Sequence, residues 1–320
     1  MNYRRLGKTG LKVSELSYGS WVTFSFQLGQ AEAKEMLSIA YDLGINFFDN
    51  AEVYASGESE VLMGNSIKAL GWSRDSYIVS SKVFWGGQKP TQRGLSHKHI
   101  LDACHAAMKR LKVDYLDLFF CHRPDPDTPI EETVRAMHTL ILQGKICYWG
   151  TSEWSSVQIM EAFKIAKDFN LTPPSMEQPE YNMFKRDKVE EEFIPLFNQY
   201  KLGTTIWSPL CSGLLTGKYI DSSPENTRTS LKNYKFIKEN FESKEFIEKH
   251  EKVKNLQLLS GELKIPLVNL VLCWCLKNKN VSTVILGASN PTQLKQNVKS
   301  LDYMDKIDDL IMGKIEKIIA

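Results

Sequence analysis

The sequence has 320 residues, of which 42% are hydrophobic and 24% charged, so the chain can bury one large core. A single barrel of about 250 residues with insertions fits this length as well as two smaller domains do. Forty Lys and Arg residues against 38 Asp and Glu residues give a formal charge of +2, and the basic residues are spread along the chain. This spread argues against nucleic acid as the main partner.

The sequence shows no export or membrane signal. Residues 1–7 lack the apolar core and the small-residue cleavage site of a secretory signal. The most apolar segment, Ile265 to Leu276, contains Asn269 and is shorter than the roughly 20 residues of a membrane-spanning helix. The six cysteines lack the paired spacing of zinc or redox motifs. We therefore expect a cytoplasmic protein that has no metal site and does not insert into a membrane.

Short apolar runs alternate with stretches of helical periodicity through most of the chain. A small hairpin, Tyr3–Leu6 with Leu11–Val13, is expected first, and we predict that it covers the amino-terminal end of a barrel. The strands expected after it are Glu15–Tyr18, Asn46–Asp49, Tyr77–Lys82, Leu116–His122, Cys147–Ser152, Ser175–Gln178, Thr204–Ser208 and Thr283–Leu286. The expected helices are Ala31–Leu43, Glu58–Leu70, His97–Leu111, Pro129–Gly144, Ser155–Phe169, Asp187–Tyr200, Ser243–Leu263, Pro266–Lys277, Pro291–Leu301 and Asp305–Ile319.

The alternation is interrupted once, after the seventh expected barrel strand. Residues from Pro209 to about Phe241 are rich in Gly, Ser, Pro, Asn and Lys, and this stretch far exceeds an ordinary connection of about two to six residues. Loops of this length inside a compact domain are usually lids or binding loops. Disorder of Asp221–Thr229 is the alternative.

Seven of the runs end on side chains that can do chemistry. In a parallel barrel the carboxyl ends of the strands meet at one face, and enzymes of this architecture build their active sites there. The pattern therefore predicts an enzyme with its site at that face. The side chains in question are Asp49, Lys82, His122, Ser152, Gln178, Trp207 and Ser289.

Four residues from neighbouring strand ends favour proton-transfer chemistry. A tyrosine hydroxyl titrates near about 10 and is useful near neutral pH only if its anion is stabilised, which a nearby ammonium does. Tyr54 follows one strand and Lys82 ends the next, so the two can face each other. Asp49 can hold Lys82 charged, and His122 can hydrogen-bond a substrate oxygen. Each residue alone also has an ordinary structural explanation, but their joint placement favours a site.

Three stretches carry a specific resemblance to a known family: Leu43–Tyr54, Ser80–Lys82 and Leu286–Asn290. With them the sequence resembles the aldo-keto reductases over nearly its whole length. The resemblance implies one domain over residues 1–320, an α/β fold of the (β/α)8 TIM barrel type with an amino-terminal hairpin and a long loop after strand seven. It also implies NADP(H) as cofactor and reduction of a small carbonyl substrate, with Tyr54 as general acid and Asp49, Lys82 and His122 completing the catalytic group.

The resemblance assigns further residues to the cofactor. Some assignments make independent sense, because Lys218 can oppose a pyrophosphate charge, Ser289 precedes a helix start, and Gln293 and Asn297 share one helical face. Backbone amides of the loop after Trp207 are expected to assist Lys218. Simple surface exposure is the alternative for the polar residues. The cofactor residues are Ser20, Trp21, Gln27, Asp49, Ser152, Gln178, Trp207, Ser208, Pro209, Leu210, Ser212, Gly213, Lys218, Arg228, Gly287, Ser289, Gln293, Gln296 and Asn297.

A set of aromatic residues is expected to form walls of the substrate pocket, with core packing as the equal alternative. These residues are Trp21, Phe24, Phe26, Trp85 and Tyr181.

Within the family, the sequence is most similar to the voltage-gated potassium channel β subunits and their bacterial reductase relatives. The similarity lies in residues 122–133, 148–152 and 207–210. Two positions depart from the pattern. His122 stands where the channel subunits commonly have Asn, and Glu153 stands where an amide or basic residue is usual beside the nicotinamide.

The resemblance therefore leaves two functional classes open. We favour an NADPH-dependent reductase of aldehydes or ketones. The alternative is a regulatory subunit that senses the NADP redox state and has a channel as its partner. His122 and a chain that starts almost at the barrel, with no room for an inactivation peptide before it, favour the enzyme. A homotetramer is also implied by the resemblance, although no sequence feature proves an interface.

Overall fold

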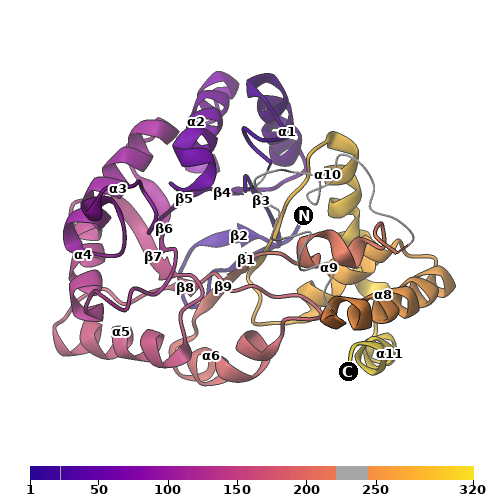
Figure 1. Cartoon of the computed structure of the whole chain (residues 1–320). Coiled ribbons are helices and arrows are strands. Elements are labelled where there is room, and N and C mark those ends of the chain that lie inside the picture. Colours follow the sequence, from indigo (N-terminus) through magenta and orange to yellow (C-terminus); the bar gives the residue numbers. More distant parts are fainter. Residues whose placement is uncertain (22, 221–243) are drawn as a thin grey trace.

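A computed structural model describes residues 1–21, 23–220 and 244–320 of the chain. Eight parallel strands close into a barrel in the order β10-β3-β4-β5-β6-β7-β8-β9, and helices surround it (Figure 1). The predicted (β/α)8 barrel is thus confirmed. The strands are β3 (Leu16–Gly19), β4 (Phe47–Asp49), β5 (Ile78–Val83), β6 (Leu116–Cys121), β7 (Ile146–Thr151), β8 (Met176–Glu177), β9 (Gly203–Ile206) and β10 (Thr283–Leu286).

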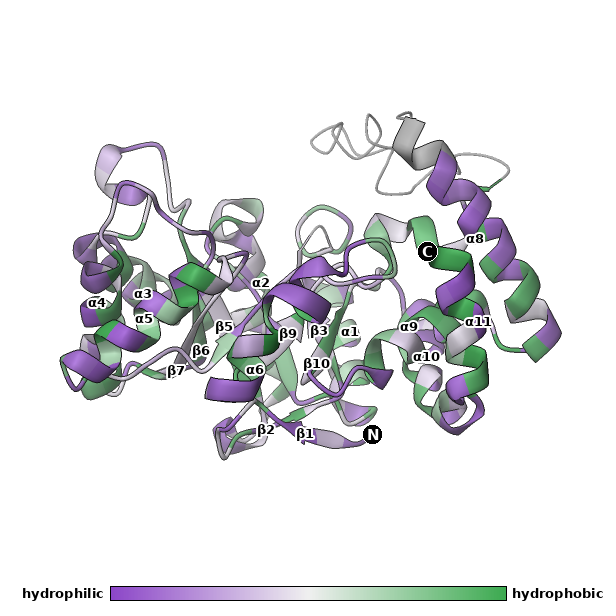
Figure 2. Ribbon diagram, turned by 90° about the horizontal axis from the view of Figure 1, so that it is seen from below, coloured by the Kyte–Doolittle hydropathy of each residue, from purple (hydrophilic) through white to green (hydrophobic). Residues whose placement is uncertain are grey.

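The helices follow the strands around the ring, from indigo α1 to yellow α11 in Figure 1. Coloured by hydropathy, they carry apolar and polar residues on different sides (Figure 2). In α4, for example, Val134 and Met137 are buried, whereas Glu131 and Glu132 occupy the first turn. The helices are α1 (Gln30–Asp42), α2 (Glu58–Leu70), α3 (His97–Leu111), α4 (Ile130–Leu142), α5 (Ser156–Asp168), α6 (Ile194–Tyr200), α8 (Lys244–Leu263), α9 (Leu267–Lys277), α10 (Pro291–Val298) and α11 (Asp309–Ile319).

Three predicted helices differ from those observed, and one of them, expected at Asp305–Ile319, begins at Asp309. The helix expected at Asp187–Tyr200 is divided into a π-helical turn, Lys188–Glu192, and α6, because Pro195 in the first turn of α6 has no N–H to continue the earlier ladder. The helix expected at Pro291–Leu301 ends at Val298 and continues as tighter 3₁₀ turns. The part of the predicted long loop that spans residues 221–243, including Asp221–Thr229, lies outside the described residues.

The amino-terminal hairpin seals one end of the barrel, as predicted. β1 (Tyr3–Arg5) pairs antiparallel with β2 (Lys12–Ser14). The turn between them needs Gly7, which has a φ of +56° and whose added Cβ would lie 2.4 Å from the Lys201 carbonyl oxygen. Side chains of the hairpin pack with side chains of the barrel strands in a hydrophobic cluster at this end of the barrel. The cluster consists of Leu6, Val13, Phe47, Ile78, Leu118, Phe120 and Met176.

In the described ranges, no single helix is both long and apolar enough to cross a membrane. Only a bent pair, Glu248–Leu263 with Leu267–Lys277 at 96°, meets the length and composition criteria together.

One buried carboxyl group gives the barrel a pH-dependent stability. Glu177 accepts a hydrogen bond from the Thr151 hydroxyl, and its Oε1 atom is buried with no partner among the described residues. Burial raises the pKa of Glu177 from 4.5 to about 8. The unfolded chain loses this proton near its ordinary pKa, so the free energy of unfolding falls as the pH rises from about 4.5 to about 8.

We expect Glu177→Gln to abolish most of this pH-dependent fall in the free energy of unfolding. For one group the fall amounts to at most about 1.4 kcal/mol per pH unit. Urea unfolding at pH 5, 6.5 and 8.5 measures it. Glu161→Gln, on the exposed side of α5, is the matched control and should keep the wild-type pH dependence. Equal pH slopes for wild type and Glu177→Gln would show that Glu177 is already ionised in the folded protein.

Candidate active site

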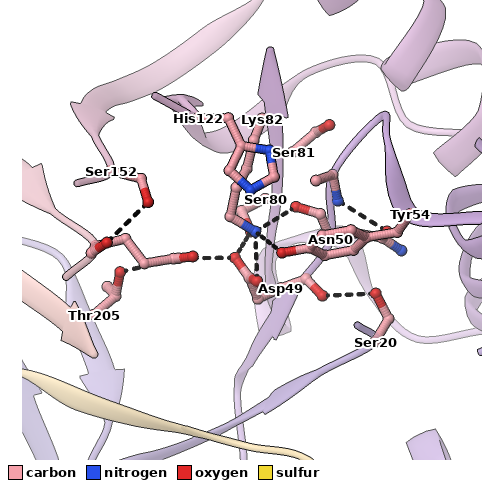
Figure 3. Close-up of polar contacts among 12 residues, drawn as sticks. Ser20, Asp49, Asn50, Tyr54, Ser80, Ser81, Lys82, His122, Ser152 and Thr205 are labelled. Carbon is pink, nitrogen blue, oxygen red and sulfur yellow. Dashed lines mark hydrogen bonds and ion pairs between the residues drawn. The ribbon is translucent and has the colours of Figure 1, made fainter. Parts of the chain in front are cut away.

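Lys82, Asp49 and Tyr54 meet at the carboxyl ends of β4 and β5 (Figure 3). The Lys82 Nζ atom donates hydrogen bonds to Asp49 Oδ2 at 2.6 Å, to the Asn50 carbonyl oxygen at 2.8 Å and to the Tyr54 hydroxyl at 3.1 Å. These bonds use all three donors of the ammonium group, and the Lys82 side chain is fully buried. The cation is therefore fixed against the phenol oxygen.

Asp49 is held by a set of polar neighbours of its own. Its Oδ1 atom accepts hydrogen bonds from the Ser80 hydroxyl at 2.8 Å and from the Gln178 amide at 3.1 Å. Its backbone carbonyl accepts from the Ser20 amide and hydroxyl, each at 3.1 Å. Both carboxylate oxygens are thus engaged, which keeps this anion beside Lys82 in a buried place where an isolated charge would be costly.

A strained turn follows Tyr54. Ala55 and Ser56 have φ values of 50° and 54°, and Gly57 follows at 93°, so three successive residues adopt the left-handed conformation. Such a conformation costs a non-glycine residue roughly 1–2 kcal/mol. The turn leads straight into α2 and leaves the phenol over the end of β5.

The sequence reasoning expected Lys82 to make the phenol more acidic, and the structure corrects this. Burial raises the pKa of Tyr54 well above its ordinary value, and the charge of Asp49 raises it further, while Arg123 opposes the shift. Tyr54 is therefore a neutral phenol at neutral pH. Its oxygen accepts from Lys82, and no acceptor for its own proton is present among the described residues. The hydroxyl is thus arranged as a proton donor.

His122 lies next to this group. Its ring packs edge-on to Tyr54 at 5.8 Å and to Trp85 at 5.2 Å between ring centroids. Burial lowers the pKa of His122 well below its usual value, and the charges of Lys82 and Arg123 lower it further, so the imidazole is neutral. Its Nδ1 atom is buried and has no hydrogen-bond partner in the described part of the chain. A neutral imidazole with an unpaired nitrogen suits a hydrogen bond to a ligand.

Asp49, Tyr54 and His122 line a cavity of about 610 Å³, whereas Lys82 is buried behind its wall. This volume is in the range of roughly 300–1,000 Å³ that is usual for cofactor and ligand sites. Tyr54, Trp85 and His122 form one part of its wall. The wall also contains most residues that the resemblance assigned to the cofactor, namely Trp21, Gln27, Asp49, Ser152, Gln178, Trp207, Ser208, Pro209, Leu210, Ser212, Gly213, Lys218, Gly287, Ser289, Gln293, Gln296 and Asn297.

Some predicted site residues lie elsewhere. Ser20 is fully buried behind the wall, where it supports the end of β4. Phe24 packs in the core against Tyr18, and Tyr181 stacks on Trp274 at 5.1 Å, so core packing is the correct alternative for both. Phe26 is 38% exposed and is not part of the cavity wall. Arg228 lies outside the described residues.

The sequence reasoning missed several wall residues. Arg123, next to His122, and Val53, next to Tyr54, could have been found because they adjoin assigned strand-end residues. Thr23 and Thr216 lie in the same loops as assigned residues, whereas Val268 is brought in by a separate element, α9.

Glu153, which departs from the family pattern beside the nicotinamide, has a structural role. Its carboxylate accepts hydrogen bonds from Trp207 Nε1 at 3.0 Å and the Glu180 amide at 2.6 Å, and it pairs with Lys188 at 2.9 Å. Burial acts to raise the pKa of Glu153, but Lys188 together with the hydrogen bonds from Glu180 and Trp207 lowers it below its usual value. The ionised carboxylate therefore fixes the Trp207 indole at the cavity wall.

The loop after Trp207 forms one side of the cavity, and the sequence predicted that it covers a pyrophosphate. After Trp207, Ser208 and Ser212 adopt left-handed φ values of 54° and 53°. The Ser212 amide donates to the Ser208 hydroxyl and the Gly213 amide to the Leu210 carbonyl, so these amides are used inside the loop rather than being open to a phosphate as expected. The Lys218 ammonium lies 3.5 Å from a Cβ built on Gly213, so a cation stands directly against this loop.

The helix start at Ser289 is the other predicted phosphate site. The Ser289 amide and hydroxyl lie 3.1 and 3.2 Å from Gln293 Oε1, and the Asn290 side chain accepts from the Gln293 amide at 2.9 Å. Gln293 and Asn297 both reach the cavity wall, which agrees with the predicted shared helical face. No group of three or more metal-ligating side chains is present among the described residues.

The barrel and the residues at the carboxyl ends of its strands define a (β/α)8-barrel enzyme. The sequence profile of the aldo/keto reductase family matches residues 15–320, and the chain belongs to that family. It is therefore an oxidoreductase, and proteins of the family generally use NAD(P)H.

Two plant proteins are similar to the chain over its full length. Proteins of Oryza sativa subsp. japonica and Arabidopsis thaliana, both described as "Probable voltage-gated potassium channel subunit beta", are each 49% identical over 321 residues. The matches cover 100% of this chain and 97% of each relative.

Proposed function

We propose that the protein reduces aldehydes or ketones to alcohols with NADPH, and that Tyr54 is the general acid. The observation that carries this proposal is the contact of Tyr54 with the buried Lys82 ammonium at 3.1 Å, at the wall of a cavity large enough for a cofactor and a small substrate. When bound, NADPH supplies the hydride that reaches the carbonyl carbon.

The residues of the site divide the proton chemistry among them. The Tyr54 hydroxyl gives its proton to the carbonyl oxygen, and the Lys82 ammonium stabilises the phenolate that remains. Asp49, at 2.6 Å from Lys82, keeps that amine charged despite burial. The neutral His122 donates a hydrogen bond that orients the carbonyl oxygen. Solvent protons then restore the phenol, so the net change is one hydride and one proton added to the substrate.

The cofactor is held by the opposite part of the cavity. The Trp207 face, fixed by Glu153, supports the nicotinamide ring, and Ser152 and Gln178 bind its carboxamide. Lys218 opposes the pyrophosphate charge. Ser289, Gln293, Gln296 and Asn297 would surround the adenosine end.

The second candidate is a channel-associated subunit in which the same cavity reports the NADP redox state. The names of the two plant relatives favour it. His122 favours the enzyme, because a neutral imidazole beside the phenol serves a reaction more directly than it serves nucleotide sensing. A homotetramer fits either candidate.

Steady-state consumption of NADPH with a panel of short aldehydes tests the proposal, alongside NADPH binding followed by quenching of tryptophan fluorescence from Trp21 and Trp207. We expect saturable binding and aldehyde-dependent consumption. Binding with no consumption for any aldehyde would favour the sensing subunit. Failure to bind NADPH would remove both candidates.

A further inference from the structure

Arg123 is the residue of the cavity wall whose chemistry the proposed function does not use. It follows His122 directly after β6, and its side chain is partly buried at the wall near Tyr54 and Trp85. The guanidinium therefore lies at the reactive part of the cavity, whereas Lys218 belongs to the loop after Trp207.

The Arg123 side chain is held in one orientation. Its Nη1 atom donates to the His122 carbonyl oxygen at 2.6 Å and to the Ser152 hydroxyl at 3.3 Å. The guanidinium carbon lies 5.5 Å from the Trp85 ring centroid and 6.0 Å from that of Trp207, distances at which cation and ring attract. Two indoles and two acceptors thus position the cation.

This positioning leaves donors unused. A guanidinium has five N–H donors, and within the described ranges no acceptor is recorded for those on Nε and Nη2 of Arg123. No carboxylate of the described residues lies within 4.0 Å of Arg123. Two acidic groups of the site are committed elsewhere, since Asp49 pairs with Lys82 and Glu153 pairs with Lys188. A cation without a counter-ion at a cavity wall is an anion-binding group.

We propose that Arg123 binds an anionic group, a carboxylate or a phosphate, on the carbonyl substrate. The inference rests on the proposed reductase function and narrows its substrate class. The fork of Nε and Nη2 matches the paired oxygens of either anion, and burial strengthens the interaction relative to water. A substrate of this class places its anion on Arg123 and its carbonyl oxygen between Tyr54 and His122. A neutral aldehyde leaves the cation unpaired at the cavity wall.

Matched substrate pairs test the proposal. Succinic semialdehyde is compared with its uncharged amide, 4-oxobutanamide, and glycolaldehyde phosphate with glycolaldehyde, so the two pairs distinguish carboxylate from phosphate. We expect the wild type to prefer the anionic member of at least one pair in kcat/KM. Arg123→Gln should lower that preference by about tenfold or more, through KM rather than kcat, because a charge-assisted hydrogen bond is lost. Arg123→Lys should retain part of it.

Two controls separate recognition from general damage. Arg135→Gln removes an exposed cation on α4 and should leave both kcat/KM values unchanged. NADPH affinity should be the same in Arg123→Gln and wild type, since a loss of cofactor binding would assign Arg123 to the cofactor instead. Equal losses for the anionic and neutral members would make Arg123 a positioning residue for His122 and overturn the proposal, as would a wild type without preference in either pair.

A binding measurement decides the matter even if none of these aldehydes is reduced. Protein saturated with NADP⁺ is titrated calorimetrically with the alcohol products of both pairs. The first pair is 4-hydroxybutyrate and 4-hydroxybutanamide, and the second is 2-hydroxyethyl phosphate and ethylene glycol. Selective binding of an anionic member, lost in Arg123→Gln, would support the anion site although the proposed reduction had failed. Absence of selective binding would reject the site whatever the catalytic result.

Discussion

Tyr54→Phe is expected to lower kcat for aldehyde reduction by a factor of roughly 10²–10⁴ and to leave NADPH affinity nearly unchanged. The substitution removes the hydroxyl, which is the proposed proton donor. It keeps the ring, which packs edge-on to His122 at 5.8 Å between centroids. The loss should therefore appear in the chemical step, and single-turnover kinetics with saturating NADPH would measure it directly.

Tyr41→Phe is the matched control. Tyr41 also has a partly buried phenol with one side-chain partner, the Ser76 hydroxyl at 2.9 Å, but it lies on α1 away from the cavity. The control should reduce aldehydes at the wild-type rate. If Tyr54→Phe did the same while binding NADPH normally, the proton would have to come from His122 or from water, and the assignment of Tyr54 would be wrong.

The sequence predicted the barrel well because its signals are local. α2 and α3 have the predicted bounds, since Gly71 ends α2 in a left-handed conformation and Ser96 caps the start of α3. Once the strands are known, their carboxyl ends must meet, so Asp49 and Lys82 could be placed together without coordinates.

The walls of the cavity could not be predicted in the same way. Whether an aromatic side chain in a connecting segment faces a cavity or the core depends on distant partners. Tyr181 turns to the core because Trp274 of α9 and the Glu190 carboxylate receive it there. In the sequence, Arg123 stood out only as part of the stretch 122–133. Whether its guanidinium can bind an anion depends on the absence of a nearby carboxylate, and no spacing in the sequence reveals that absence.

The direction of the Tyr54 pKa shift was misjudged for a related reason. The sequence reasoning started from the pKa of an ordinary phenol in water and considered only one influence on it, the charge of Lys82. In the folded protein, removal of the phenol from water is the largest influence on its pKa, and the Asp49 charge adds to it. The proton-donor role survives this correction, since a phenol that stays protonated is what the reductive direction requires.

Lys82→Met is expected to destabilise the fold by about 3–5 kcal/mol and to abolish most turnover, because it leaves the buried Asp49 carboxylate without its cation. Adding Asp49→Asn should recover most of the stability, since the amide carries no charge and can keep the hydrogen bonds from Ser80 and Gln178. Turnover should stay low in this double variant, because the phenolate of Tyr54 still lacks a stabilising charge. Urea unfolding and steady-state rates of the wild type, Lys82→Met, Asp49→Asn and the double variant measure both effects.

Lys98→Met supplies the comparison for this cycle. Lys98 pairs with Asp102 on α3, but its side chain is 64% exposed, so its loss should cost less than about 1 kcal/mol. Recovery of stability without recovery of turnover would separate the structural role of the Lys82–Asp49 pair from the catalytic role of the ammonium. A double variant that regained the wild-type rate would mean that Lys82 serves Tyr54 only by keeping Asp49 neutralised, and the charge assigned to the transition state would then have to come from Arg123.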